Sequence, residues 1–243
     1  SESFAWRING NLASSSSNAL TGPFLTGDSI VCEATVTDGI DTTTASSAAL
    51  LISNGAPVIT DLTFTPTTLY TNDLLIATVQ ANDPDRDTLT YTWEWSVDAG
   101  LGAAGVQTTS TASSVDSLDG LVHFDKDDSV SVLVTVSDGL DSVTLQSPSI
   151  TVLNTPPTVF NALIVPVNPV AGLDDLDCQT QLSDADGDTV NLQYSWTVNG
   201  MSVNYTSPTI SANDIADGDS WTCTIACDDG QDAGNTLTAT TIV

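Results

Sequence analysis

The sequence predicts an all-β protein built from antiparallel sandwich domains placed end to end. Strand-like runs are dense, and the runs at residues 74–81 and 129–136 are rich in β-branched side chains and end in Asp/Gly turns. In the second run, positions 130, 132, 134 and 136 are all valine and form one apolar face with a period of two. No stretch has a sustained helical period, so we expect short strands throughout.

The chain also repeats itself at the length of a small sandwich domain. Three kinds of segment recur, namely an aromatic strand, a strand that begins near Asp-Ser, and an Asp-Gly turn. They lie at residues 4–10, 91–95 and 194–200, at 27–32, 127–132 and 218–223, and at 37–39, 137–139 and 228–230. Pro57 and Pro157, in matching linkers, lie 100 residues apart. We therefore expect three units, at residues 1–54, 55–154 and 155–243, in a tandem array.

Two motifs carry a resemblance to a known family. Trp196 on the third predicted strand, with Cys178 before it and Cys223 after it, resembles the immunoglobulin Cys…Trp…Cys pattern. The acidic stretches at residues 184–188 and 228–230 are similar to the tandem Ig-like and cadherin-like repeats of large microbial surface proteins. The resemblance covers the whole chain and implies Ig-like sandwiches at an extracellular or cell-surface location. It says little about function, because this sandwich hosts many unrelated roles.

The resemblance also implies a disulfide between Cys178 and Cys223. Cys227 faces inward on the same predicted strand, so Cys178 could pair with either cysteine, although the alignment favours Cys223. In the second unit Ala77 and Val132 occupy the two cysteine positions, and we expect that core to pack around Trp93 instead. Disulfides indicate an oxidising, extracellular setting.

The first unit is expected to be incomplete at its N-terminal side. Cys178 precedes Trp196 by 18 residues, whereas Trp6 has no room for such a partner before it. By comparison with the third unit, the first lacks two strands. They would belong either to further copies of the repeat in the same chain or to a neighbouring subunit of a filament. Cys32, which aligns with Cys223, is expected to form an upstream or intermolecular disulfide with them.

Charge restricts the partners. The chain has 3 basic and 31 acidic side chains, for a formal net charge of −28. Nucleic acid and anionic membrane surfaces are excluded as natural partners by this charge. No apolar run is long enough to cross a bilayer, so direct membrane insertion is not expected.

The acidic side chains are almost all aspartates, which suits metal-binding loops as well as tight turns. Aspartates at alternate positions around a turn can direct carboxylates at one point, and we expect calcium at two domain junctions. The candidate ligands are Asn54, Asp83, Asp85, Asp87 and Asp138 at the first, and Asn154, Asp184, Asp186, Asp188 and Asp229 at the second. Loops with Asp28, Asp125 and Asp127 are expected to face the same junctions. The alternative is that these loops are solvated turns, with Arg86 paired to a neighbouring aspartate.

Catalysis has little support, and we expect no enzyme. His123 is the only histidine, and one lysine and two arginines leave little for a triad or a zinc site. Paired aspartates could mimic a glycosidase dyad, but they recur in equivalent loops, as structural elements do. The sequon at Asn204 is a possible glycosylation site. Trp95 and Trp221 could stack on sugars, but their facing predicts core positions.

Two functional classes remain. The first is a structural segment of a rod, stalk or filament on a microbial surface, stiffened by calcium and disulfides. The alternative is an adhesin or carbohydrate-binding module. The repeated residues are turns, linkers and core, which favours the first class. Residues 96–117 form a long stretch without aromatics, which we interpret as a flexible insertion or an edge hairpin.

Overall fold

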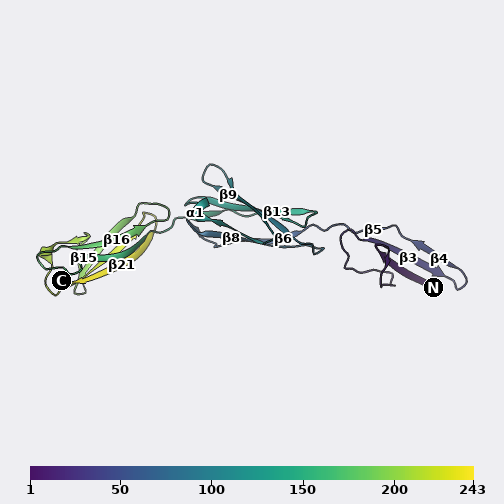
Figure 1. Cartoon of the computed structure of the whole chain (residues 1–243), viewed down its shortest axis with the longest axis horizontal. Coiled ribbons are helices and arrows are strands. Elements are labelled where there is room, and N and C mark those ends of the chain that lie inside the picture. Colours follow the sequence, from purple (N-terminus) through teal and green to yellow (C-terminus); the bar gives the residue numbers. More distant parts are fainter.

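The computed structural model describes residues 1–243 and arranges its strands in three groups that follow one another in a row (Figure 1). Helical structure is limited to α1 (Gly120–His123) and the 3-10 turn η1 (Ala212–Asp214). None of the helices has the length and apolarity needed to span a bilayer. The predicted all-β class is confirmed.

The middle group, here called domain 2, is a sandwich of two sheets. One sheet has the order β11-β8-β6 and the other the order β10-β9-β12-β14-β7, with β13 also paired to β12. The strands are β6 (Val58–Thr65), β7 (Leu69–Tyr70), β8 (Leu74–Asn82), β9 (Thr90–Asp98), β10 (Ala104–Thr111), β11 (Val115–Asp119), β12 (Ser129–Ser137), β13 (Ser142–Gln146) and β14 (Ile150–Leu153). The short strands β7 and β14 pair in parallel, whereas the others pair antiparallel. This division of strands between two sheets is that of an Ig-like sandwich.

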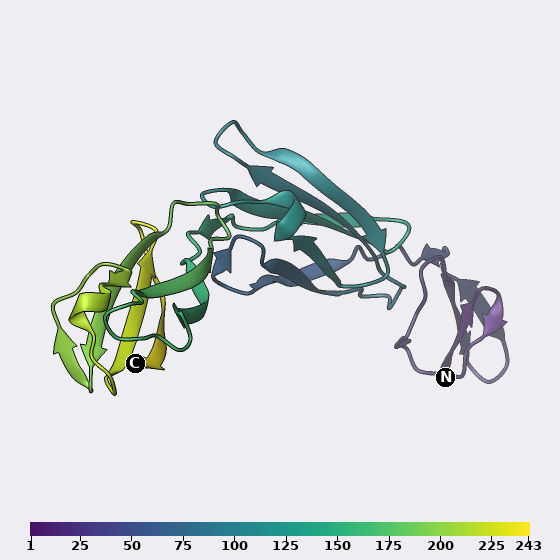
Figure 2. The ribbon, with the colours of Figure 1, turned by 60° about the vertical axis from the view of Figure 1, so that its left-hand side comes forward.

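The last group, domain 3, repeats this plan. Its sheets have the orders β15-β16-β19 and β18-β17-β20-β21. The strands are β15 (Thr158–Val165), β16 (Leu176–Ser183), β17 (Asn191–Val198), β18 (Met201–Val203), β19 (Thr209–Ile210), β20 (Ser220–Asp228) and β21 (Ala233–Ile242). Residues 96–117, interpreted as a flexible insertion or an edge hairpin, form the edge hairpin β9–β10 and part of β11 in domain 2 (Figure 2).

The first group, domain 1, is a single sheet with the order β2-β1-β3-β4 and with β5 paired to β3. Its strands are β1 (Glu2–Ile8), β2 (Asn11–Leu12), β3 (Ser29–Thr37), β4 (Thr42–Ser46) and β5 (Leu50–Leu51). Trp6 lies opposite Cys32 in this sheet as Trp196 lies opposite Cys223 in domain 3. The sheet therefore corresponds to the sheet of domain 3 that contains β17 and β20. On its apolar face Ile30 is buried, but Cys32 is only half-buried and Val36 is 52% exposed.

Domains 2 and 3 each have a hydrophobic core of their own. All four valines of the predicted face of β12, at positions 130, 132, 134 and 136, are fully buried. Trp93 and Trp95 are buried in the same core, and Trp196 packs edge-on against the buried Trp221 at a ring separation of 6.2 Å. The tryptophans of these two domains are thus core residues, as their facing predicted.

The register differs from the sequence alignment in one respect. Trp95, which pairs with Val132, is the residue equivalent to Trp196, whereas Trp93 pairs with Val134. The expectation that Trp93 is the counterpart of Trp196 is wrong by two residues. The error did not change the predicted facing, because side chains two apart on a strand point to the same side. The Nε1 group of Trp95 donates to Asp116 Oδ2 at 2.8 Å.

The disulfide expected between Cys178 and Cys223 is present, with the two Cα atoms 6.4 Å apart. Cys227 is a buried free thiol whose sulfur contacts the carbonyl oxygens of Pro157 and Asn235 at 3.6 and 3.4 Å. Burial raises the pKa of the Cys227 thiol, which keeps it protonated and unreactive near neutral pH. In domain 2 the positions equivalent to Cys178 and Cys223 are occupied by Ala77 and Val132, which are both fully buried.

Replacing both Cys178 and Cys223 by alanine should destabilise domain 3 and leave domain 2 unchanged. The bridge joins residues 45 apart in the sequence, and closing a loop of this length stabilises by about 4 kcal/mol in the chain-entropy model. Urea unfolding followed by tryptophan fluorescence should show one transition shifted and one retained. Peptide mapping of the unmodified chain that found Cys178 bonded to Cys227 would contradict the register of β16 and β20.

Candidate functional site: the junctions between domains

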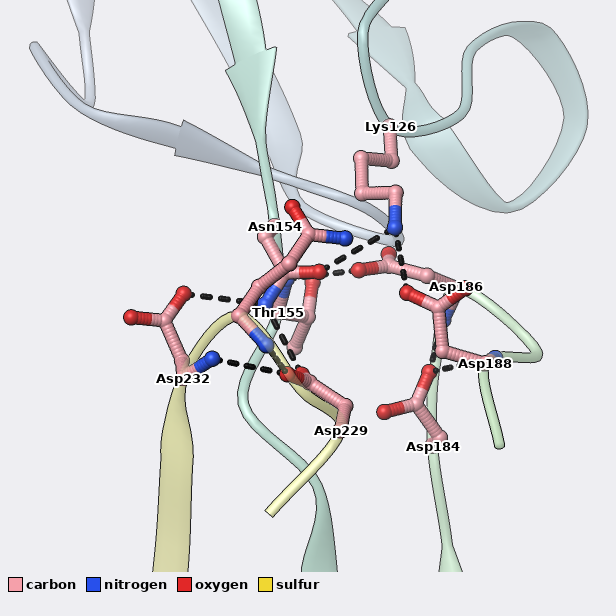
Figure 3. A network of polar contacts seen from close by, with 9 residues as sticks. Lys126, Asn154, Thr155, Asp184, Asp186, Asp188, Asp229 and Asp232 are labelled. Carbon is pink, nitrogen blue, oxygen red and sulfur yellow. Dashed lines mark hydrogen bonds and ion pairs between the residues drawn. The ribbon is translucent and has the colours of Figure 1, made fainter. Parts of the chain in front are cut away.

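Two short linkers join the domains, and the same polar residues surround both. Junction 1 lies between domains 1 and 2 around Asn54, and junction 2 lies between domains 2 and 3 around Asn154. Figure 3 shows junction 2, in which side chains from the linker and from both adjoining domains converge. Most of the predicted metal ligands lie here, so these junctions are the candidate functional site.

Each linker asparagine binds one turn of the next domain, the turn that follows β12 in domain 2 and β20 in domain 3. The Nδ2 group of Asn54 donates to Asp138 and Asp141, at 2.8 Å in both cases. Asn154 Nδ2 donates to Asp229 and Asp232 at 2.8 and 2.9 Å. One amide thus binds two carboxylates of one turn, in the same way at both junctions.

The first aspartate of each turn, Asp138 or Asp229, accepts the backbone N–H groups of the same turn with one carboxylate oxygen. Asp138 Oδ1 accepts the backbone N–H groups of Leu140 and Asp141, both at 2.7 Å. Its other oxygen, Oδ2, is left for Asn54. The hydrogen bond from Asn54, together with those from the turn amides, lowers the pKa of Asp138, and Asn154 does the same for Asp229. Both carboxylates are therefore held in the charged form.

The acidic loop that follows β8 in domain 2 and β16 in domain 3 binds the linker backbone. Asp85 Oδ2 accepts the N–H of Gly55, and Asp186 Oδ2 accepts the N–H of Thr155, each at 2.6 Å. The first aspartate of each loop shapes it from inside. Asp184 Oδ1, for example, accepts the N–H groups of Asp186 and Asp188 at 2.9 and 3.1 Å.

The same loops bring three carboxylates together. The ligand oxygens of Asp83, Asp85 and Asp87 lie within 4.8 Å of one another, as do those of Asp184, Asp186 and Asp188. Three oxygens in these triads, Asp83 Oδ2, Asp184 Oδ2 and Asp186 Oδ1, are fully buried and have no hydrogen-bond partner. Such orphaned carboxylate oxygens are costly without a cation. Calcium, with oxygen ligands at about 2.3–2.6 Å, fits this donor set.

The preceding domain contributes one further side chain to each junction. At junction 1 it is Thr26, whose hydroxyl contacts Asn54 Oδ1 at 3.3 Å and Asp85 Oδ2 at 3.0 Å. At junction 2 it is Lys126, whose ammonium donates to Asn154 Oδ1 at 3.2 Å and forms an ion pair with Asp188 (Figure 3). The hydrogen bond to Asp188 raises the pKa of Lys126. Each linker asparagine therefore contacts both neighbours, through its carbonyl and its amide.

The loops that carry Asp28, Asp125 and Asp127 face the junctions, as expected, but the contacting side chains in them are Thr26 and Lys126. Asp28 does not contact junction 1, because its carboxylate accepts from Asn9 Nδ2 and Leu25 N–H within domain 1, at 2.7 and 2.8 Å. Asp125 and Asp127 are exposed at junction 2, and the contact is made by Lys126 between them. Arg86 is exposed and forms no ion pair with the aspartates beside it.

Four contacting residues were not predicted: Thr26, Lys126, Asp141 and Asp232. The aspartates had a sequence signal, because Asp-Gly-X-Asp recurs at residues 38–41, 138–141 and 229–232. Among the remaining predictions, Asn204 is exposed in the loop after β18, and its glycosylation remains a prediction. His123 is the half-buried last residue of α1.

No family model and no curated protein matches the sequence. Among solved structures, the chain is similar to domains FN1–FN3 of chicken CNTN1, with 7% identity, a TM-score of 0.36, and coverage of 100% of this chain and 89% of that chain. It is also similar to three domains of the bacteriophage RB49 outer capsid protein Hoc, with 15% identity, a TM-score of 0.32 and coverage of 99% and 85%. It is similar as well to the four N-terminal Ig domains of a Dscam1 isoform, with 13% identity and a TM-score of 0.29, and it spans 66% of the length of that structure.

Replacing Asn154 by alanine should loosen domain 3 from domain 2, because the asparagine contacts both domains and its loss leaves Lys126 with Asp188 alone. We expect backbone amide relaxation of the whole chain to report two bodies that tumble more independently, with each domain still folded. Asn168→Ala, the same change at an exposed position in domain 3, is the matched control. Equal tumbling of the two variants would show that Asn154 does not couple the domains.

Acid should loosen both junctions before it unfolds the domains. Because the pKa values of Asp138 and Asp229 lie below their ordinary 3.8, their contribution is complete above about pH 4 and is lost as the pH falls through the lowered values. Amide relaxation, recorded as the pH is lowered from about 5 to 2, should show coupling decline while circular dichroism reports intact strands. In Asn154→Ala the same titration should change junction 2 less than in the unmodified chain, because only the contacts of Asp186 and Asp188 remain to be lost there.

Proposed function

We propose that this chain is a non-catalytic structural segment of an extracellular tandem array, a rod, stalk or filament on a microbial surface. The observation that supports this most directly is the repetition of one clamp at two successive junctions. In both, the linker asparagine binds a turn of the next domain, and the acidic loop of that domain binds the linker backbone, by hydrogen bonds of matching geometry. A repeated coupling between whole domains serves reach and orientation. The disulfide in domain 3 supports an extracellular location.

The alternative, an adhesin or carbohydrate-binding module, has less support. Sugar recognition relies on exposed aromatic faces, but Trp93, Trp95, Trp196 and Trp221 all lie in the two cores. The loop of the β9–β10 hairpin exposes Leu101, at 97%, without an aromatic residue. Domains 2 and 3 are therefore better suited to a structural role.

We further propose that calcium binds at the two acidic triads and stiffens the array. Asp83, Asp85 and Asp87 would hold it at junction 1, with Asn54 and Asp138 beside them. Asp184, Asp186 and Asp188 would hold it at junction 2, with Asn154 and Asp229 adjacent. The buried carboxylate oxygens without partners support this proposal. A bound ion would satisfy them and would oppose the repulsion among the charges of each triad.

Calcium should raise the thermal stability of the chain and reduce its interdomain motion. Binding to the folded state alone stabilises by about 2.7 kcal/mol at a hundredfold excess over the dissociation constant. Calorimetric titration should show saturable binding that sodium at equal ionic strength does not reproduce. Asp83→Asn and Asp184→Asn should each weaken one site while retaining the Oδ1 acceptor that shapes the loop, and Asp217→Asn, at an exposed position away from both junctions, is the control. No saturable heat would mean that the loops are solvated turns.

The partners we propose are further copies of the repeat. The apolar face of domain 1 corresponds to the face that β15, β16 and β19 cover in domain 3. Cys32 occupies the position of Cys223, and it is a half-buried free thiol. A strand pair like β15–β16, from the same polypeptide or a neighbouring subunit, would cover this face and bring a cysteine to Cys32.

Non-reducing electrophoresis of native material distinguishes the two sources. A ladder that collapses on reduction indicates strands from neighbouring subunits, and hence an open filament, since a heterologous contact need not close. A single band with Cys32 bonded to another cysteine of the same polypeptide indicates one long chain. Recovery of Cys32 as a free thiol from native material would show that neither version is right.

A further inference from the structure

The two junctions share their geometry but differ in charge at one position. The residue that reaches the junction from the preceding domain is neutral at junction 1, where it is Thr26, and cationic at junction 2, where it is Lys126. Both occupy the same place, two residues before the aspartate that immediately precedes β3 or β12, at Asp28 and Asp128. Both contact the side-chain oxygen of the linker asparagine.

We propose that Lys126 is a built-in counter-ion that couples domains 2 and 3 without metal and competes with a divalent cation for Asp188. The competition rests on the proposed calcium sites, whereas the coupling rests on the contacts of Lys126 alone. Junction 1, which has Thr26 in this place, then depends on a bound cation for the same stiffness.

The contacts of Lys126 join three parts of the chain. Its backbone belongs to the loop before β12 in domain 2, its ammonium donates to Asn154 in the linker, and it pairs with Asp188 in domain 3. Its side chain is only 16% exposed, so the ion pair is partly shielded from water. An ion pair of this kind is more effective than an exposed one, because solvent and salt screen it less.

The same contact opposes a metal ion at the triad. Asp188 is one of the three carboxylates whose oxygens lie within 4.8 Å of one another, and it already forms an ion pair with Lys126. A divalent cation must displace the ammonium or bind next to it. A unit positive charge a few ångströms away weakens dication binding by about tenfold even at a water-like dielectric constant. The orphaned oxygens of Asp184 and Asp186 remain open to the ion once Lys126 leaves.

Junction 1 has no cation paired with its triad, because Arg86, although it lies in the same loop, is exposed and forms no ion pair. The chain forms only two ion pairs, Arg7 with Glu33 and Lys126 with Asp188, and neither involves Asp83, Asp85 or Asp87. Thr26 supplies a single neutral hydrogen bond to Asp85. We therefore expect the first triad to bind calcium more tightly than the second, and junction 1 to respond more strongly to chelation.

The test compares three variants of the whole chain, Lys126→Met, Lys126→Arg and Thr26→Lys, in chelator and in calcium. Methionine keeps the length and apolar stem of lysine without the charge, and arginine keeps the charge. Backbone amide relaxation measures the coupling at each junction, and calorimetry measures calcium affinity. In chelator, Lys126→Met should free domain 3 from domain 2, Lys126→Arg should not, and Thr26→Lys should tie domain 1 to domain 2. In calcium, Lys126→Met should bind at junction 2 about tenfold more tightly than the unmodified chain.

The outcomes separate this inference from the calcium proposal. If Lys126→Met leaves junction 2 as stiff in chelator as the unmodified chain, the counter-ion role is wrong. If Lys126→Met loosens junction 2 but neither protein binds calcium, the counter-ion role stands and the calcium sites are wrong. If both proteins bind calcium at junction 2 with equal affinity, the competition for Asp188 is wrong.

Discussion

The pairing of negative charge is the constraint on which the rest of the structure depends. A chain with a formal net charge of −28 can place its domains end to end only if the carboxylates that meet there have partners. Asp138 and Asp229 use one oxygen for their own turn and the other for a linker asparagine. Asp85 and Asp186 use an oxygen for the linker backbone. Short aspartate side chains suit this purpose, because they satisfy nearby amides and still face outward.

The sandwich fold makes this arrangement repeatable. The loop after β8 or β16 and the turn after β12 or β20 lie at the same end of their domain, so they flank the incoming linker together. The cores behind them differ without altering this end: domain 3 has a disulfide against Trp196, and domain 2 has Ala77 and Val132 against Trp95. Core composition can therefore vary between repeats while the junction stays the same.

The sequence was sufficient for the fold class and for which residues face the core, because both follow from the period of two. It was not sufficient for register, since Trp93 and Trp95 fit the same period, although the spacing of 18 from Ala77 to Trp95 matches that from Cys178 to Trp196. At the junctions, the linker asparagines and acidic loops were predictable from repetition. Lys126 was not, because its counterparts Thr26 and Asp217 share no chemistry with it, and only the geometry shows which neighbour it meets.

The parallel pairing of β7 and β14 has a mechanical consequence. The chain enters domain 2 just before β6 and β7 and leaves it just after β14, so tension between the two linkers draws β7 and β14 in opposite directions along their length. When two strands are pulled past one another, all the hydrogen bonds between them carry the load at the same time. When one strand is peeled from its end, the hydrogen bonds break one after another. In domain 3 the bond from Cys178 to Cys223 fixes a 45-residue stretch that pulling cannot extend. Domains 2 and 3 thus resist extension differently: domain 2 by shear between β7 and β14, and domain 3 by a disulfide that limits its length.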